Sequence, residues 1–383
     1  MGRPLRVGLF SPYFGATYGG GEKYLALAAR AVQDRWPAVQ VDLIGSVPAD
    51  AERYALRLGL DLSGLRLVAT NRQVTKAHRL LNRASFLRPL RNRVVGAQAS
   101  RLTREYDVFI AMAYVIPVRN QAARGAILCQ FPYPLGSDSD LTGYQLVICQ
   151  SQYVRKWVLQ RWRREATVVY PPVEIPAEEP DWQAKRNSIL SVGRFAAGGH
   201  DKRQDAMVAA FKRLCDAGLT GWRLHLAGSV HQDAHHAGHF EVIERASAGY
   251  PVTLHPDILQ EGLQRLYREA SIYWHSAGLG VDEEADPAAL EHFGMTTVEA
   301  MGHGAVPVVI GRGGQSEIVR DGIDGFLWLD PRHLIDLTSK LVGDSALRRR
   351  LGESARERSH LFSREVFALR LTEALEPLLA DRG

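Results

Sequence analysis

Short apolar runs alternate with longer segments of helical hydrophobic period, and this alternation constrains the fold more than any other feature of the sequence. The first series of expected elements comprises strands at 7–10, 39–44, 108–112, 126–129 and 146–149, with a helix at 23–32. The second series comprises strands at 189–192, 224–227, 252–254, 272–275, 306–310 and 325–329. The pattern is typical of βαβ units, so it predicts an α/β chain with two doubly wound parallel sheets.

A proline-rich segment separates the two series, with four prolines among residues 170–180. Proline lacks a backbone N–H and cannot continue a helix or a central strand. We therefore predict an N-terminal domain over residues 1–170, a linker over 171–180 and a C-terminal domain over 181–362. The remainder, 363–383, carries the apolar stripe of an amphipathic helix, which we expect to pack back onto a domain.

Composition excludes the disordered and fibrous classes, because 46% of the residues are hydrophobic and 23% are charged. The net charge of +5 favours anionic partners without identifying one. Three widely spaced cysteines fit a reducing compartment better than a disulfide scaffold. We find no signal peptide and no membrane-spanning apolar run, so the expected location is cytoplasmic.

The segment Arg72–Arg104 holds nine lysines and arginines and no acidic residue. An anionic membrane surface or a lipid-linked acceptor is one candidate partner, which would place the protein peripherally at the inner face of a membrane. A solvated helical face is the plain alternative. Nucleic acid is not an expected partner.

The strongest signal for chemistry is a pair of glutamates, Glu291 and Glu299, on either side of a Phe293-Gly294 turn. The turn precedes a helical segment, so its backbone N–H groups would lie at a helix N-terminus, where a diphosphate can bind. The two carboxylates could accept hydrogen bonds from sugar and ribose hydroxyls. A helix cap with surface glutamates is the alternative, which the following Gly-x-Gly-x-x-Pro-Val-Val segment disfavours.

This Glu-x7-Glu pattern resembles the hallmark of the retaining GT-B glycosyltransferases of glycosyltransferase family four, and the resemblance covers nearly the whole chain. It implies two Rossmann-like domains facing a cleft, the first for an acceptor and the second for a nucleotide sugar. It also implies that Glu291 lies near the donor sugar and Glu299 binds the ribose. The backbone at Phe293, Gly294, Met295 and Thr296 would then bind the phosphates.

Two cations follow the first strand of the second series: Arg194 at the strand end and Lys202 after a glycine-rich loop. Both can reach one anion, and in the resembled family these positions neutralise the leaving nucleoside diphosphate. Arg194, Lys202 and Glu291 are therefore the predicted catalytic residues, with no metal or other cofactor expected. Ordinary surface salt bridges are the alternative.

Glycines after the first strand, Gly20 and Gly21, allow close approach of a ligand, and the resemblance makes them donor-binding candidates. A simple tight turn is the alternative, and the segment lacks the dinucleotide fingerprint of an oxidoreductase. Gln130 and Tyr133 follow another strand, as candidate acceptor residues. Many family members carry a histidine where this chain has Gln130, and a glutamine cannot act as a general base.

Other polar segments have weaker signals. The loop after strand 252–254 is expected to read the nucleotide base through backbone atoms, with Ile258 as its candidate. Gly313 and Gly314 could approach the donor closely. The acidic stretch 282–286 and the Asp138-Ser-Asp140 sequence suggest a metal, but a solvated loop and a turn explain them better.

The sequence thus predicts a retaining transferase that moves a hexose from a nucleotide diphosphate sugar to a hydroxyl acceptor. GDP-mannose is favoured slightly over UDP-glucose. A glycan, a lipid-linked molecule or a small molecule could be the acceptor. Two rivals remain: a nucleotide-sugar isomerase or phosphorylase of the same fold, and a binding protein that has lost transfer.

Overall fold

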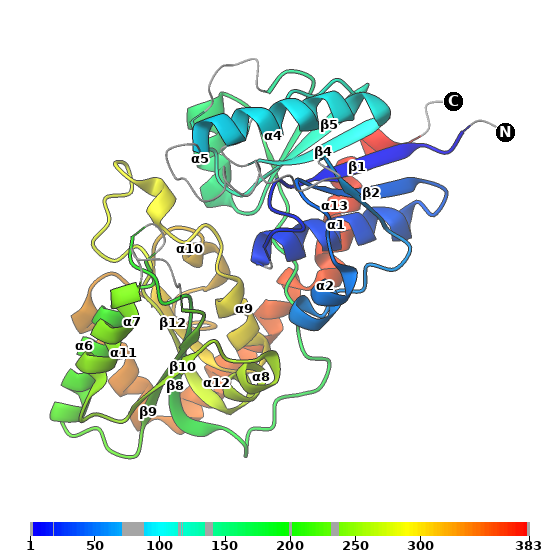
Figure 1. The fold of residues 1–383 in the computed structure, drawn as a ribbon. Coiled ribbons are helices and arrows are strands. Elements are labelled where there is room, and N and C mark those ends of the chain that lie inside the picture. Colours follow the sequence, from blue (N-terminus) through cyan, green and yellow to red (C-terminus); the bar gives the residue numbers. More distant parts are fainter. Residues whose placement is uncertain are drawn as a thin grey trace. The chain divides into compact units, whose positions relative to one another are not determined.

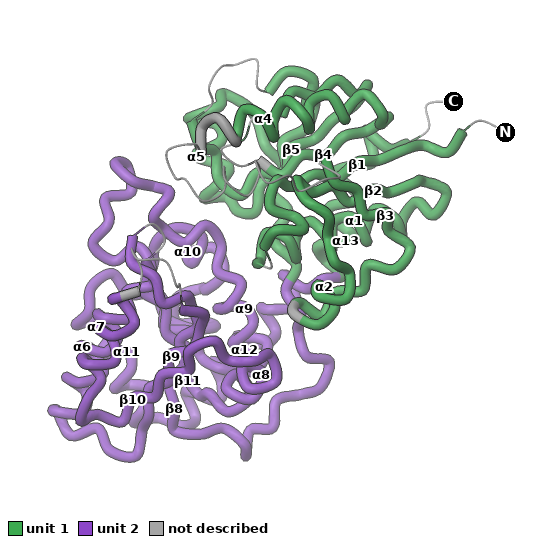
Figure 2. Tube along the Cα trace, in the orientation of Figure 1, with its two compact units in different colours: residues 1–172, 365–383 green, residues 173–364 purple. Residues whose placement is uncertain are grey.

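The computed structural model describes residues 3–17, 19–70, 88–113, 116, 118–134, 141–198, 201–230 and 237–380. The chain forms two compact units (Figure 2). Unit 1 comprises Met1–Pro172 and Glu365–Gly383, and unit 2 comprises Val173–Arg364. The division falls just after Pro172, so most of the proline-rich segment belongs to unit 2.

Unit 1 is built on a seven-stranded parallel sheet in the order β3-β2-β1-β4-β5-β6-β7. Its strands are β1 (Arg6–Phe10), β2 (Gln40–Gly45), β3 (Arg66–Ala69), β4 (Val108–Ala113), β5 (Arg124–Cys129), β6 (Leu146–Cys149) and β7 (Thr167–Val168). All five strands expected from apolar runs in this half are present. The two edge strands, β3 and β7, were not expected.

Helices lie on both faces of this sheet (Figure 1). They are α1 (Gly20–Arg35), α2 (Ala51–Leu58), α4 (Arg88–Leu102), the short η2 (Thr103–Glu105), α5 (Gln152–Trp162) and α13 (Arg364–Leu379). Both α2 and α5 begin at a side-chain cap: the Asp50 carboxylate accepts from the Arg53 N–H at 3.2 Å at the start of α2, and the Ser151 hydroxyl accepts from the Val154 N–H at 3.0 Å at the start of α5.

The C-terminal helix α13 returns to unit 1, where it lies beside α1 (Figure 1). The ring of Phe367 meets the edge of the Tyr24 ring at a centroid distance of 5.2 Å. Leu371 and Leu375 are fully buried in the same core. The helix expected from the apolar stripe at the end of the sequence therefore completes the hydrophobic core of unit 1, which the N-terminal residues otherwise form.

Unit 2 is built on a six-stranded parallel sheet in the order β10-β9-β8-β11-β12-β13. Its strands are β8 (Arg186–Val192), β9 (Arg223–Gly228), β10 (Val252–Pro256), β11 (Ala270–His275), β12 (Val306–Ile310) and β13 (Phe326–Trp328). Its helices are α6 (Gln204–Asp216), α7 (Ala237–Ser247), α8 (Gln260–Glu269), η4 (Pro287–Ala289), α9 (Met295–Gly302), α10 (Gln315–Ile318), α11 (Pro331–Gly343), α12 (Ser345–Ser359) and η5 (His360–Phe362).

The strand order of unit 2 has a switch point between β8 and β11. The chain runs outward from β8 to the β10 edge and then returns to β11 to build the other half of the sheet. Loops leaving β8 and β11 therefore diverge at the carboxyl edge, which is where open α/β sheets bind ligands. Lys202 follows β8 and Glu291 follows β11, so the fold places both candidates at this edge.

No helix in the described part of the chain has the length and apolar content needed to cross a bilayer.

Candidate functional site

Lys202, Glu291 and His275 form one cluster at the carboxyl edge of the unit 2 sheet. The ammonium of Lys202 donates to Oε2 of Glu291, and Nε2 of His275 lies 3.0 Å from the same oxygen. The side chains of Lys202 and Glu291 are 18% and 16% exposed, so the pair is largely shielded from water. Two predicted catalytic residues are thus brought together, and Lys202 is paired with a candidate partner rather than with a surface carboxylate.

Small residues around Lys202 fix its position. A β-carbon on Gly193, at the end of β8, would lie 2.6 Å from the Cγ atom of Lys202, so only glycine lets the lysine stem pass. The hydroxyl of Ser276, directly after β11, donates to the Lys202 carbonyl at 2.8 Å. The β8 and β11 loops are therefore tied to each other at the base of the cluster.

His275 is the last residue of β11 and is only 3% exposed. Burial lowers the pKa of its imidazole, although the hydrogen bond to Glu291 opposes that shift. A neutral imidazole has one N–H, and the ionised carboxylate of Glu291 can only accept. The proton therefore resides on Nε2, and no described residue hydrogen-bonds the buried Nδ1 atom.

The turn that links Glu291 to α9 is shaped by three glycines. Gly294 precedes α9 with φ at 120°, a conformation that favours glycine, and no side chain in the described residues caps the helix there. Gly313 and Gly314 pack against this turn so closely that a β-carbon on either would lie within 2.5 Å of the Glu291 or His292 carbonyl oxygen. The N–H of Gly314 also donates to the Glu291 carbonyl at 2.8 Å.

The positive end of α9 lies next to the cluster in sequence. The first N–H groups of a helix, here from Met295 and Thr296, have no acceptor inside the helix and attract anions. The Phe293 side chain points into the core, 2% exposed and edge-on to Phe362 at 5.4 Å. Only the backbone of Phe293 can contribute to a binding site, as the sequence analysis expected.

Two tyrosines hold the polar side chains of α9. The Tyr267 hydroxyl donates to Oε2 of Glu299 at 2.7 Å, and the Tyr273 hydroxyl contacts the Thr296 hydroxyl at 2.7 Å. Both tyrosine rings are fully buried, and burial raises their pKa values, so the two hydroxyls stay protonated. They therefore fix the positions of Glu299 and Thr296.

Arg194 and Ile258 lie at the ends of neighbouring strands. Arg194 follows β8 and is exposed, and its carbonyl accepts from the buried Gln204 amide at 3.0 Å. Ile258 follows β10 and is half-buried. The preceding residue, Asp257, has a positive φ of 50° and donates its N–H to the Gly228 carbonyl at 2.8 Å. This turn is thus fixed against the end of β9.

The acidic insertion between β11 and Glu291 is held by two arginines through its backbone. Arg203 donates to the Leu279 carbonyl at 2.7 Å, and Arg312 donates to the Val281 carbonyl at 2.6 Å. Across the described residues, no group of three or more His, Cys, Asp or Glu side chains is placed to hold a metal ion.

In unit 1, Gly20 and Gly21 are the first residues of α1, and the Glu22 carboxylate accepts from the Gly19 N–H at 2.8 Å. The Gln130 carbonyl accepts from the Gln150 amide at 2.9 Å, and the Tyr133 carbonyl accepts from the Trp162 indole at 3.0 Å. These contacts fix the backbone at each candidate. They assign no role to the candidate side chains.

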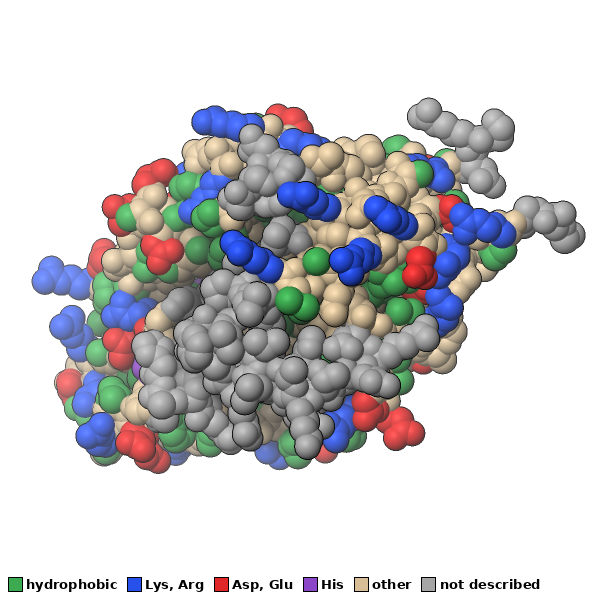
Figure 3. All heavy atoms as spheres, turned by 45° about the horizontal axis from the view of Figure 1, so that its top comes forward, with side chains coloured by type: hydrophobic (Ala, Val, Ile, Leu, Met, Phe, Trp, Pro, Cys, Tyr) green, Lys and Arg blue, Asp and Glu red, His purple; other side chains and the backbone are tan. Residues whose placement is uncertain are grey.

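The basic segment is described only in part. Its residues 72–87, and both aspartates of the Asp138-Ser-Asp140 sequence, lie outside the described residues. Within the described part, Arg93, Arg101 and Arg104 are exposed. Figure 3 shows several basic side chains on the face of unit 1 that carries α4.

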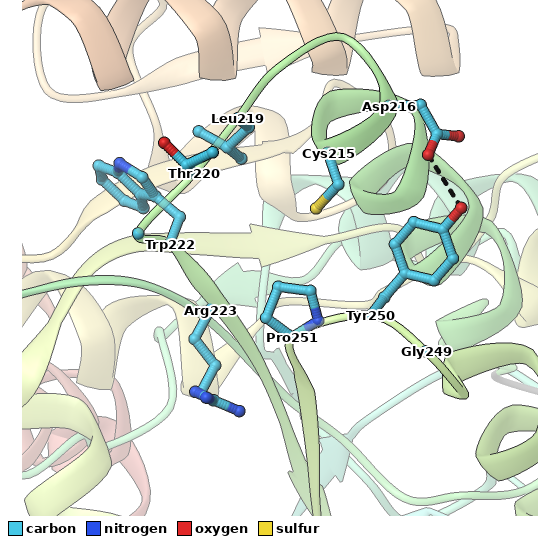
Figure 4. A pocket seen from close by; sticks show the side chains of 10 residues that line it. Cys215, Asp216, Leu219, Thr220, Trp222, Arg223, Gly249, Tyr250 and Pro251 are labelled. Carbon is cyan, nitrogen blue, oxygen red and sulfur yellow. Dashed lines mark hydrogen bonds between the residues drawn. The ribbon is translucent and has the colours of Figure 1, made fainter.

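Two surface hollows lie away from the Lys202–Glu291–His275 cluster. One, of about 680 Å³, is at the amino ends of β9 and β10 in unit 2, between Trp222 and the hydrogen-bonded pair Tyr250 and Asp216 (Figure 4). The other, of about 1070 Å³, follows the edge strand β3 in unit 1. None of the predicted catalytic or donor-binding residues lines either hollow, although Arg101 of the basic segment lines the one beside β3. The charged pair Lys202 and Glu291, together with the start of α9 at the β8–β11 switch point, therefore indicates the site better than either hollow does.

Three residues that contact the candidate site were not predicted from the sequence: His275, Tyr267 and Tyr273. His275 and Tyr273 were counted only as part of an expected strand, and Tyr267 lies in α8, far along the chain from its partner Glu299. A titratable residue as the last residue of a buried strand was a usable signal for His275. No local pattern marks the two tyrosines.

Comparison with protein families gives a match to the model of glycosyl transferases group 1 over residues 174–358. Among characterised proteins, a D-inositol 3-phosphate glycosyltransferase of Nocardioides is 36% identical over 112 residues, which are 29% of this chain and 22% of that protein. A GDP-Man:Man(3)GlcNAc(2)-PP-Dol alpha-1,2-mannosyltransferase of Dictyostelium discoideum is 22% identical over 97% of this chain and 85% of its own length.

Solved structures share the fold over nearly the whole chain. A sucrose-phosphate synthase from Thermosynechococcus elongatus superimposes with a TM-score of 0.71 at 19% identity, covering 98% of this chain and 99% of that one. HepE of Anabaena, in complex with UDP and glucose, gives 0.69 at 16% identity, covering 97% and 100%. The two parallel-sheet units are thus those of the GT-B fold, and residues 174–358 match the model of glycosyl transferases group 1.

Proposed function

We propose that this protein is a retaining glycosyltransferase that moves a hexose from a nucleotide diphosphate sugar to a hydroxyl acceptor. The observation that carries the proposal is the Lys202–Glu291–His275 cluster beside the uncapped start of α9. It combines a shielded cation, a shielded carboxylate and a helix N-terminus in the domain that matches glycosyl transferases group 1.

Negative charge develops on the leaving diphosphate as the bond to the sugar breaks. Lys202 would supply one positive charge and Arg194 a second, while the first N–H groups of α9 would bind phosphate oxygens. Fixed cations in a shielded site stabilise such charge without the reorganisation that water needs. We therefore propose that departure of the diphosphate requires no metal ion.

The role that we assign to Glu291 is to bind sugar hydroxyls. Its Oε2 atom accepts from both Lys202 and His275, and hydrogen bonds of that kind stabilise a carboxylate and reduce its nucleophilicity. A double displacement would need an unencumbered carboxylate at the anomeric carbon. Retention through attack on the same face as the departing phosphate fits this arrangement better.

We propose GDP-mannose ahead of UDP-glucose as donor, since a mannosyltransferase that uses GDP-Man matches nearly the whole chain. The acceptor of that relative is a lipid-linked glycan, which makes a lipid-linked acceptor the first to try. The exposed arginines of α4 would favour an anionic membrane surface.

The test is a transfer assay with GDP-mannose, UDP-glucose and UDP-N-acetylglucosamine, each with a chelator and with a panel of lipid-linked and soluble acceptors. Proton NMR of the product would give its anomeric configuration. We expect a product that keeps the configuration of the donor sugar and an unchanged rate with chelator. An inverted product would rule out the retaining mechanism. Formation of a sugar phosphate that depends on added inorganic phosphate, in place of a hydroxyl acceptor, would favour a phosphorylase.

A further inference from the structure

We propose that His275 is a positioning residue that holds the Glu291 carboxylate while Lys202 passes from Glu291 to the diphosphate of the donor. The inference rests on the proposed function, because it assigns Lys202 to the leaving phosphates. It concerns a residue that lies in no sequence motif for the site.

The geometry places two donors on a single carboxylate oxygen. Lys202 and His275 both meet Oε2 of Glu291, one from the loop after β8 and the other from the end of β11. Lysine carries its charge on a long flexible stem, so its ammonium can move between neighbouring anions. His275 is attached to a central strand and is almost wholly buried, so it cannot follow.

Transfer of Lys202 to a phosphate would remove a cationic partner from Glu291. A carboxylate that is 16% exposed loses much of its stabilisation when its partner leaves. The N–H of His275 limits that loss and keeps the carboxylate in the orientation that a sugar hydroxyl would meet. A neutral donor suits this role, because it holds the carboxylate without cancelling its charge.

The position of His275 also connects the two loops of the switch point. The next residue, Ser276, donates to the carbonyl of Lys202 at 2.8 Å. One short segment therefore fixes the backbone of the lysine and the carboxylate of the glutamate. His275 sets the distance over which Lys202 must move.

The first experiment reads the tautomer without using activity. In histidine-labelled wild-type protein, ¹⁵N NMR should show Nε2 of His275 protonated and Nδ1 unprotonated at neutral pH, with the signal assigned by its loss in His275→Gln. Addition of UDP or GDP should leave that tautomer unchanged. An Nδ1–H tautomer or an imidazolium would overturn the proposal, whether or not the protein transfers sugar.

The second experiment uses two replacements of opposite kind. Gln can place an N–H where Nε2 of His275 lies, whereas Leu fills similar space without a donor. We expect His275→Leu to lower kcat by about 10–100-fold with little change in donor KM, the usual loss for a residue that orients a site group. His275→Gln should stay within about threefold of wild type.

A double-mutant cycle with Glu291→Gln separates positioning from general stability. If His275 acts through Glu291, His275→Leu should cost less than about twofold in the Glu291→Gln background. Equal losses in both backgrounds, or full turnover by His275→Leu, would overturn the proposal. Absence of transfer by wild type with every donor would count against the proposed function, and the tautomer measurement would still decide the role of His275.

Discussion

Two shielded carboxylates, Asp42 in unit 1 and Glu291 in unit 2, both accept hydrogen bonds from cationic side chains. They differ in burial and in their position along the strand. Asp42 lies within β2, is wholly buried, and accepts from Arg66, from Arg6 at 3.4 Å and from the Tyr106 hydroxyl at 2.9 Å. Glu291 lies beyond the end of a strand, is partly exposed, and is followed by a helix N-terminus.

The difference separates a structural cluster from a candidate functional one. The Asp42 carboxylate is wholly buried within β2, so a ligand could reach it only by opening the core, although the Arg66 side chain beside it is 53% exposed. Lys202 approaches Glu291 from a glycine-rich loop at the switch point, where an incoming ligand could replace it. Carboxylate and cation pairs therefore indicate function only where one partner can exchange.

The largest expected effect is on stability, at the cluster that Asp42 forms with Arg66, Arg6 and Tyr106. Asp42→Ala should lower the free energy of unfolding by about 3–5 kcal/mol, because it leaves the buried Tyr106 hydroxyl and the largely shielded Arg6 guanidinium without their acceptor. Denaturant unfolding measures this loss, with Glu52→Ala, at an exposed site in the first turn of α2, as a control within about 0.5 kcal/mol of wild type. A loss for Asp42→Ala below 1 kcal/mol would contradict the structural assignment.

The Lys202–Glu291–His275 cluster should show the opposite result, a large loss of activity with a smaller loss of stability. Lys202→Ala should lower sugar transfer by about 10²–10³-fold, the loss typical of one group that stabilises transition-state charge. Unfolding free energy should fall by less than in Asp42→Ala, because His275 still donates to Glu291 when the lysine is removed. Wild-type turnover in this variant would remove Lys202 from the mechanism.

A smaller effect is expected where a buried hydroxyl supports a site carboxylate. Tyr267→Phe removes the donor to Glu299 and should weaken binding of a nucleoside diphosphate by about 3–10-fold, a loss of the size of one typical hydrogen bond. Calorimetric titration would give the affinity. Tyr250→Phe, whose hydroxyl bonds Asp216 on the surface away from the site, should bind as wild type does.

The smallest effect concerns acid stability of unit 2. His225 and His255, on adjacent strands with Nδ1 and Nε2 2.9 Å apart, both have lowered pKa values, and burial brings that of His225 to about 4. A base whose pKa is lowered by folding binds more protons when the protein is unfolded. The contribution of the two neutral histidines to stability is therefore present above pH 6.5 and is lost as the pH falls toward 4.

Both rings are only half-buried, so solvent screening should hold the loss to about 1 kcal/mol, or about 2–4 °C in Tm. Melting curves of wild type and His225→Val between pH 7 and 4.5 would measure it. The Tm gap between the two proteins should narrow or reverse on acidification. Parallel curves would show that the pair does not titrate with folding.

The sequence was sufficient to predict the central strands, and the half-buried edge strand β10 with them, because their apolar runs leave few other structures. It was not sufficient for the edge strand β3, which is half-buried and begins with the charged Arg66. The two-residue β7 is too short to produce a pattern.

In the candidate site, too, the sequence predicts some residues but not the contacts between them. Lys202 and Glu291 could be predicted because charged residues after buried strands meet at one edge of a parallel sheet. Their direct pairing could not be predicted, since it depends on Gly193 and Ser276, which hold the lysine in place from different loops. The partners His275 and Tyr267 follow from tertiary packing and needed the structure.

The central claim is that Lys202 belongs to a diphosphate site, and calorimetric titration of UDP and GDP tests it most directly. Wild type should bind one of the two nucleotides, equally well with a chelator present. Lys202→Ala should bind it at least tenfold more weakly, while Lys340→Ala, at an exposed position of α11, should match wild type. Equal affinity of the Lys202 and Lys340 variants would contradict the account.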